Sequence, residues 1–169
     1  MSAVLEASRW IEQLGLVRHK EGGFYRQSYK SAGSIPKISL PNCFDSERSF
    51  STAIYFLLEA DDFSAFHRIN QDELWHFYCG NPVTIHTINE AGEYRAIKLG
   101  CDLNLNEFPQ AIVKAQTYFA ASVDSMDGYA LVGCTVAPGF EYEDFELPDR
   151  QQLITRFPAH RELIEKFSR

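Results

Sequence analysis

The stretch that decides the fold runs from Phe66 to Gly80 and reads FHRINQDELWHFYCG. Its pattern predicts a short strand, a polar turn and a second, aromatic-rich strand that ends at Gly80. His67 and Glu73 lie on either side of the turn. Both side chains can ligate a metal or move a proton. What the chain does therefore depends on whether these two residues meet in one pocket.

Composition excludes several classes of protein. A chain of 169 residues with 45% hydrophobic residues is expected to fold as one globular domain, residues 1–169. Its net charge of −7 argues against a nucleic-acid partner, because phosphate binding needs clustered Lys and Arg. The sequence contains no apolar run long enough to cross a membrane and no basic and apolar leader, so we expect a cytoplasmic protein. The four widely spaced cysteines are expected to be buried thiols rather than zinc ligands.

Hydrophobic periodicity predicts a mainly β protein with short terminal helices. Residues 3–14 have helical spacing, with Ser2 as a candidate N-cap and Gly15 as the stop. Residues 31–47, rich in Ser, Pro and Gly, are expected to form a loop. Strands are predicted at 24–29, 50–58, 83–88, 94–99, 111–123 and 129–136, and helical spacing returns after Asp149. This order favours a β-sandwich or barrel.

The first stretch resembles the first motif of the cupins, which is His-x-His, three or four residues, Glu, six residues and Gly. His67, Glu73 and Gly80 occupy three of the four motif positions, and Ile69 stands where the second His would be. The second cupin motif, Pro-x-Gly-x-x-His, would fall at residues 114–119, where the chain reads KAQTYF. Phe119 therefore replaces the histidine of the second motif.

Over residues 10–158 the chain is similar to one uncharacterised cupin family, a domain of unknown function. The resemblance rests on EGGFY at 21–25, STAIYFLL at 51–58, the stretch 66–80, and VAPGFEYEDF at 136–145. It implies a double-stranded β-helix, or jelly roll, with a ligand cavity in the barrel mouth, and a homodimer. The chain departs from the family pattern at Lys20, Lys114 and Gln116. The resemblance brings no established reaction.

Ligand counting argues against a metal or other cofactor. Cupins that bind metal use two His and the Glu of the first motif and the His of the second. Here only His67 and Glu73 can serve, and a catalytic metal site usually has at least three protein ligands. His76 has the opposite strand parity to Glu73 and is expected to face away from it. His19, His86 and His160 are expected to be surface or turn residues.

Without a metal, His67 and Glu73 form a candidate acid–base pair, with His67 as the base and Glu73 as the residue that orients it. Arg26 could anchor a polar or anionic ligand, or could instead be solvated or ion-paired. The remaining candidate ligand-binding residues are polar or aromatic and could contact or shield a sugar ring or a nucleobase: Tyr25, Thr52, Trp75, Phe77, Tyr118 and Phe119.

Three functions are compatible with these residues. The first is a metal-independent isomerase or epimerase acting on a small sugar-like or nucleotide-type molecule. The metal-free deoxysugar-nucleotide epimerases share the cupin architecture, and this likeness is one of architecture only. The second is a ligand-binding cupin without catalysis. The third is a metal-dependent oxygenase or isomerase with a degenerate site.

Overall fold

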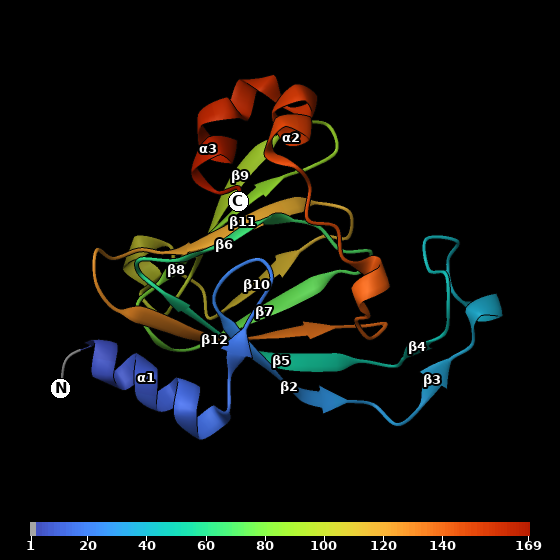
Figure 1. Cartoon of the computed structure of the whole chain (residues 1–169), viewed down its shortest axis with the longest axis horizontal. Helices are drawn as coiled ribbons and strands as arrows, with labels where there is room; N and C mark the ends of the chain where they lie inside the picture. The colour runs from blue at the N-terminus through green and yellow to red at the C-terminus, as the bar shows by residue number, and fades with distance from the viewer. Residues whose placement is uncertain (1–2) are drawn as a thin grey trace.

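A computed structural model describes residues 3–169 and shows two antiparallel sheets that face each other, with helices at the two ends of the chain (Figure 1). Helix α1 spans Ala3–Leu14 and ends at Gly15, which has a positive φ of 60°. The predicted helix 3–14 is confirmed, whereas its candidate N-cap, Ser2, lies outside the described residues. No helix in the described part of the chain is long and apolar enough to cross a membrane.

The larger sheet has six strands in the order β1-β2-β5-β12-β7-β10. Their bounds are Val17–Arg18 (β1), Phe24–Lys30 (β2), Thr52–Glu59 (β5), Tyr129–Val136 (β12), Glu73–Gly80 (β7) and Gln110–Val113 (β10). The smaller sheet has the order β6-β11-β8-β9, with bounds Phe63–His67 (β6), Tyr118–Val123 (β11), Val83–Ile88 (β8) and Tyr94–Leu99 (β9). This architecture is the predicted mainly β jelly roll.

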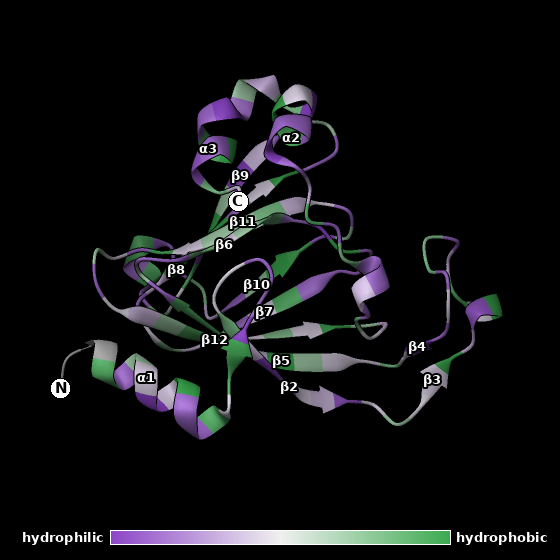
Figure 2. Cartoon of the chain, viewed as in Figure 1, coloured by the Kyte–Doolittle hydropathy of each residue, from purple (hydrophilic) through white to green (hydrophobic). Residues whose placement is uncertain are grey.

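The main core fills the space between the two sheets. It contains Phe56, Trp75, Ile85, Phe119 and Val132, all at most 1% exposed. Figure 2 shows the corresponding hydrophobic segments along the facing strands. On the outside, α1 packs against Leu57, Tyr129 and Leu131 of the larger sheet, forming a second cluster.

The C-terminal helices cover the outer face of the smaller sheet. Helices α2 (Arg150–Arg156) and α3 (Arg161–Lys166) are joined by the 3-10 helix η4, Pro158–His160. Leu153, Ile154 and Ile164 of these helices pack on Phe66 and Tyr118. The Tyr118 side chain therefore points towards the helices and not between the sheets.

Two segments differ from their predicted structure. Residues 111–123 form two strands, β10 and β11, because a turn interrupts them at Gln116, whose φ is +63°. Neither Gly nor Pro marks this turn in the sequence. The predicted loop 31–47 contains strand β3 (Ser34–Ile35), which pairs with β4 (Arg48–Ser49), and the 3-10 helix η1 (Lys37–Ser39). Figure 1 shows this segment as an arm that extends from the barrel.

The stretch 66–80 folds as its pattern predicts. Strand β6 ends at His67, a polar turn follows, and β7 runs from Glu73 to Gly80. Gly80 has a φ of +96°, and a Cβ there would lie 2.2 Å from the carbonyl oxygen of Tyr129. Only glycine fits this position without a shift of the backbone.

Candidate functional site

A cavity of about 360 Å³ opens at one end of the barrel. Its walls come from β2, β5, β6, β7 and β12, from the turn that carries His19 and Glu21, and from the segment Phe140–Phe145. The last segment includes the 3-10 helix η3, Tyr142–Asp144. This volume lies at the lower end of the range for small-molecule pockets, about 300–1,000 Å³.

Glu21 lies at the centre of the polar part of this cavity. The Ser64 hydroxyl donates to its Oε1 at 2.8 Å. Its Oε2 lies 3.2 Å from His67 Nε2 and 3.3 Å from His19 Nδ1. The residue is only 6% exposed. Glu21, and not Glu73, is thus the carboxylate that contacts His67.

His67 is held from both sides of its ring. Its Nδ1 lies 2.7 Å from the Ala65 carbonyl oxygen, which can only accept, so Nδ1 carries a proton. Phe119 and Phe145 pack against the ring at centroid distances of 4.0 and 5.3 Å. The ring is therefore fixed, and its Nε2 is directed at Glu21.

Burial and mutual charge set the pKa values of Glu21 and His67 together. Burial opposes the charge of Glu21, but the nearby His67 and His19 and the Ser64 hydroxyl lower its pKa overall. Burial lowers the pKa of His67, which the charge of Glu21 offsets only in part. Because Oε2 and Nε2 lie 3.2 Å apart and His67 Nδ1 already carries a proton, a proton taken up by the pair would be shared between these two atoms.

Glu73 lines the same cavity in the opposite protonation state. Burial, followed by the charge of Glu21, raises its pKa to about 8. The Cys134 thiol and the Trp75 indole N–H lie beside its carboxyl group and moderate this shift. Glu73 is 8% exposed, so it is a carboxylic acid that stays protonated at neutral pH.

Four aromatic rings surround His19. Tyr25 packs edge-on at 4.5 Å, Phe56 and Phe145 at 6.3 and 5.9 Å, and Tyr142 stacks at 6.3 Å. The Tyr142 hydroxyl lies 3.5 Å from His19 Nε2 and 3.0 Å from the Tyr25 hydroxyl. His19 was expected at the surface or in a turn. It occupies a turn, but it lines the cavity.

Of the nine residues predicted for the site, the structure brings four to the cavity wall: His67, Glu73, Tyr25 and Thr52. The Thr52 hydroxyl accepts a hydrogen bond from the backbone N–H of Phe140 at 2.9 Å, which joins β5 to the far wall. Trp75 and Phe119 lie behind the wall in the core, each 1% exposed.

The other three predicted residues lie away from the cavity. Strand parity places Tyr25 and Gln27 at the cavity and Arg26 on the opposite face, where its guanidinium lies over the Tyr55 ring. Phe77 packs against the main core further along β7. Tyr118 donates to Glu146 at 2.8 Å on the helical side of its sheet. His76 faces away from Glu73, as predicted, and contacts Thr135 at 3.2 Å.

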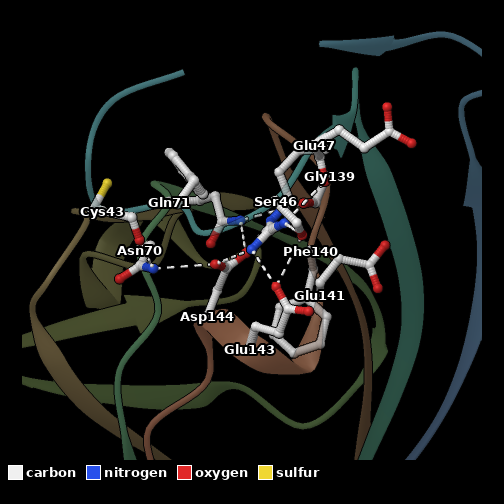
Figure 3. Close-up of polar contacts among 12 residues, drawn as sticks. Cys43, Ser46, Glu47, Asn70, Gln71, Gly139, Phe140, Glu141, Glu143 and Asp144 are labelled. Atoms are coloured by element: carbon white, nitrogen blue, oxygen red, sulfur yellow. Dashed lines mark hydrogen bonds and ion pairs between the residues drawn. The ribbon is translucent and has the colours of Figure 1, made fainter. Parts of the chain in front are cut away.

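A buried ion pair fixes the segment that closes the cavity (Figure 3). The side chain of Arg48 is fully buried, and its Nε and Nη2 donate to Asp144 at 2.8 and 2.7 Å. Asn70 and Gln71 also donate to Asp144, at 3.1 and 2.7 Å. Asp144 follows Tyr142 in η3, so this cluster ties the cavity wall to β4 and to the turn after β6.

Comparison with known proteins agrees with this architecture. A family described as Cupin superfamily (DUF985) matches residues 8–148. The chain belongs to this cupin family. A crystal structure of a Shewanella oneidensis protein is 39% identical to this cupin, with a TM-score of 0.87 over 96% of this chain and 97% of the other. A hypothetical protein from Leishmania major is 32% identical, with a TM-score of 0.86 over 96% and 98% of the two chains.

More distant relatives define the limits of this likeness. An uncharacterized protein of Saccharomyces cerevisiae is 26% identical over 144 residues, which cover 79% of this cupin and 71% of the yeast chain. Oxalate decarboxylase from Bacillus subtilis is 13% identical, with a TM-score of 0.54 over 89% of this cupin and 36% of the decarboxylase. At that identity the likeness concerns the fold alone.

The side chains of this cupin do not fit the metal that many cupins hold. Phe119 pairs with His67 across β11 and β6, and Ile69 lines the cavity, so two ligand positions are apolar. Glu21 Oε2 faces His67 and His19 at hydrogen-bond distances. Within residues 3–169, no group of three or more His, Cys, Asp or Glu residues is arranged to hold a metal ion. We therefore derive no step through a metal.

Sequence reasoning missed Glu21, His19, Tyr142 and Cys134 as site residues. Glu21 begins the EGGFY segment, and Tyr142 lies within VAPGFEYEDF, so the resemblance had marked both segments without assigning them a role. Local spacing could not have found the contact, because 46 positions separate Glu21 from His67.

Proposed function

We propose that this cavity is the active site of a metal-independent isomerase or epimerase, in which buried carboxyl groups move a proton next to a carbonyl. One observation supports it above the others. Two buried carboxyl groups line one cavity, and Glu21 is held by hydrogen-bonding partners while Glu73 is packed beside Cys134 and Trp75. Pairs of titratable groups with divergent environments are typical of acid–base catalysis.

The two carboxyl groups divide the reaction between them. Glu21, with His67 beside it, takes the proton from a carbon next to the carbonyl of the substrate, and the electron pair of the broken C–H bond forms the C=C bond of an enol. Glu73 donates its proton to the carbonyl oxygen, which would otherwise become an oxyanion. Return of a proton to carbon, with Glu73 recovering its own, completes an epimerisation or isomerisation. No redox step occurs.

The cavity walls favour an uncharged, sugar-like substrate. Tyr25, Phe140, Tyr142 and Phe145 provide aromatic surface of the kind that packs against sugar rings. Lys30 is the lysine of the cavity wall, and its ammonium group is paired with the Glu141 carboxylate at 2.5 Å. A phosphate group would therefore meet carboxylates without a free cation, so a keto sugar or aldose fits better than a nucleotide.

Deuterium exchange in heavy water tests the proposal whatever the product of the reaction is. We expect the protein to catalyse deuterium uptake next to the carbonyl of at least one compound in a panel of aldoses, ketoses and keto-deoxy sugars, followed by NMR. Glu21→Gln should lower that exchange rate by about 10²–10⁴-fold, the usual contribution of a general base. Glu93→Gln, an exposed carboxyl-to-amide control, should leave it unchanged.

The same panel separates catalysis from simple binding. A compound that raises the melting temperature of the protein but takes up no deuterium above the blank would assign the cavity to a ligand-binding module. Equal exchange by wild type and Glu21→Gln would remove Glu21 as the base. Added EDTA should not change the rate.

A further inference from the structure

The hydrogen bonds around Glu21 continue outward to the protein surface. From Glu21 Oε2 the chain of contacts passes to His19 Nδ1 at 3.3 Å, and from His19 Nε2 to the Tyr142 hydroxyl at 3.5 Å. The Tyr142 hydroxyl then meets that of Tyr25 at 3.0 Å. Tyr142 is 43% exposed, whereas the His19 and Glu21 side chains are 9% and 8% exposed. The buried carboxylate is thus connected to solvent through two side chains.

We infer that His19 and Tyr142 form a proton relay that exchanges the proton held by Glu21 with bulk water. This inference rests on the proposed function, since it specifies how the same base is reset between turnovers. It assigns a role to His19 that the mechanism above does not use. In this role His19 and the Tyr142 hydroxyl act through Glu21, while the Tyr142 ring also lines the cavity.

The proton balance of the relay is simple. Protonated Glu21 gives its proton to His19 Nδ1, the Nε2 proton of the same ring passes to the Tyr142 oxygen, and the Tyr142 hydroxyl releases its own proton to water. The reverse sequence returns a solvent proton to Glu21. An imidazole suits this task because its two nitrogens can accept and donate on opposite sides of one ring.

The packing around His19 keeps the relay in place. Four aromatic rings fix the imidazole between Glu21 and Tyr142. The Tyr142 ring lies 6.3 Å from the imidazole, centroid to centroid, at an interplanar angle of 20°, and its hydroxyl lies beside Nε2. Tyr142→Phe keeps the ring and loses only the hydroxyl, which makes it the informative variant.

The first test needs no substrate. Exchange of the His19 ring N–H proton with water is measured by NMR saturation transfer in the ligand-free protein. The relay predicts exchange several-fold slower in Tyr142→Phe than in wild type, because the buried imidazole has lost its proton acceptor. Tyr94→Phe, whose hydroxyl bonds His86 away from the cavity, is the matched control and should match wild type. Equal or faster exchange in Tyr142→Phe would overturn the relay.

The second test uses any substrate found by the deuterium panel. Wild type should place a solvent deuterium on the reacting carbon at each turnover. Tyr142→Phe keeps the ring that lines the cavity and should return the original proton to carbon more often. Deuterium per turnover, a ratio that is independent of the conversion rate of the variant, should therefore fall several-fold. Unchanged incorporation would contradict the relay. Absence of both turnover and exchange in wild type would instead refute the proposed function, while the ligand-free measurement would still decide the relay.

Discussion

Two buried ionic clusters contact the Phe140–Phe145 segment, one through Asp144 and the other through Tyr142, and they are built in opposite ways. In one, the fully buried Arg48 meets Asp144 through two short hydrogen bonds, and Asn70 and Gln71 add two more. In the other, Glu21 meets two histidines at 3.2 and 3.3 Å, beside an open cavity. The carboxylate of the first cluster is paired with a permanent cation, whereas that of the second faces two imidazoles.

This difference gives the two clusters different roles: the first holds the structure in place, and the second can take part in a reaction. A guanidinium cannot lose its proton in a protein, so the Arg48–Asp144 pair can only fix geometry. Imidazole and carboxyl groups can both gain and lose a proton, so the Glu21 cluster can change state during a reaction. Three substitutions, in the first cluster, in the cavity and outside both, test these assignments from the largest expected effect to the smallest.

Arg48→Met breaks the Arg48–Asp144 cluster. The variant leaves Asp144 as a buried charge without its partner, which should lower the free energy of unfolding by about 3–5 kcal/mol. Urea denaturation measures this loss. The double variant Arg48→Met with Asp144→Leu should recover most of the stability, because it removes both charges. A loss below about 1 kcal/mol, as for an exposed ion pair, would contradict the assigned role.

Glu73→Gln tests the protonated acid. In the folded protein Glu73 releases its proton only near pH 8, whereas in the unfolded chain it does so near 4.5. Between these values the unfolded state binds fewer protons, so this group makes the wild type less stable as pH rises. Glutamine removes that slope. The stability of Glu73→Gln relative to wild type should therefore grow by a few kcal/mol from pH 4.5 to 8 and then level off.

Urea denaturation at several pH values checks this difference. The pKa of His67 is lowered by burial and contributes a slope of the opposite sign below pH 6.5, but it does so in both proteins and cancels in the comparison. Parallel stability curves for the variant and the wild type would show that Glu73 is ionised in the folded protein.

Arg26→Ala should have the smallest effect. The guanidinium lies over Tyr55 outside the cavity, so its removal should change the free energy of unfolding by less than about 0.5 kcal/mol. It should also leave ligand affinity unchanged, as measured by calorimetry with any ligand from the exchange panel. A clear loss of affinity would restore Arg26 as the anchor that sequence analysis allowed.

The fold was largely predictable because its signals are local. Alternating strands, the glycine at position 80 and the resemblance to a cupin motif together give the jelly roll and most strand bounds. The break between β10 and β11 was missed because Gln116 adopts a positive φ without the usual glycine. Backbone contacts such as that from Gln116 N–H to the Ile69 carbonyl, at 3.0 Å, support this turn and leave no mark in the local pattern.

The candidate site was predictable only in part, because its contacts are long-range. Strand parity correctly placed His76 and Glu73 on opposite faces of β7. It cannot tell which face of β2 meets the cavity, so Tyr25 and Arg26, on opposite faces, both remained candidates. The motif identified His67 and not its partner, since Glu21 comes from a turn far away in the chain. Cys134 drew no attention because a buried thiol is usually structural.

The turn that carries Glu21 also bears on how the protein folds. Gly22 has a φ of +119°, and a Cβ there would lie 2.1 Å from the Phe63 carbonyl oxygen, so the turn lies directly against the start of β6. The Glu21 carbonyl accepts the N–H of Ala65 at 2.9 Å in the same contact. Glu21 reaches the cavity only when this turn is in place, so docking of the turn onto β6 is the step that supplies the barrel with its buried carboxylate.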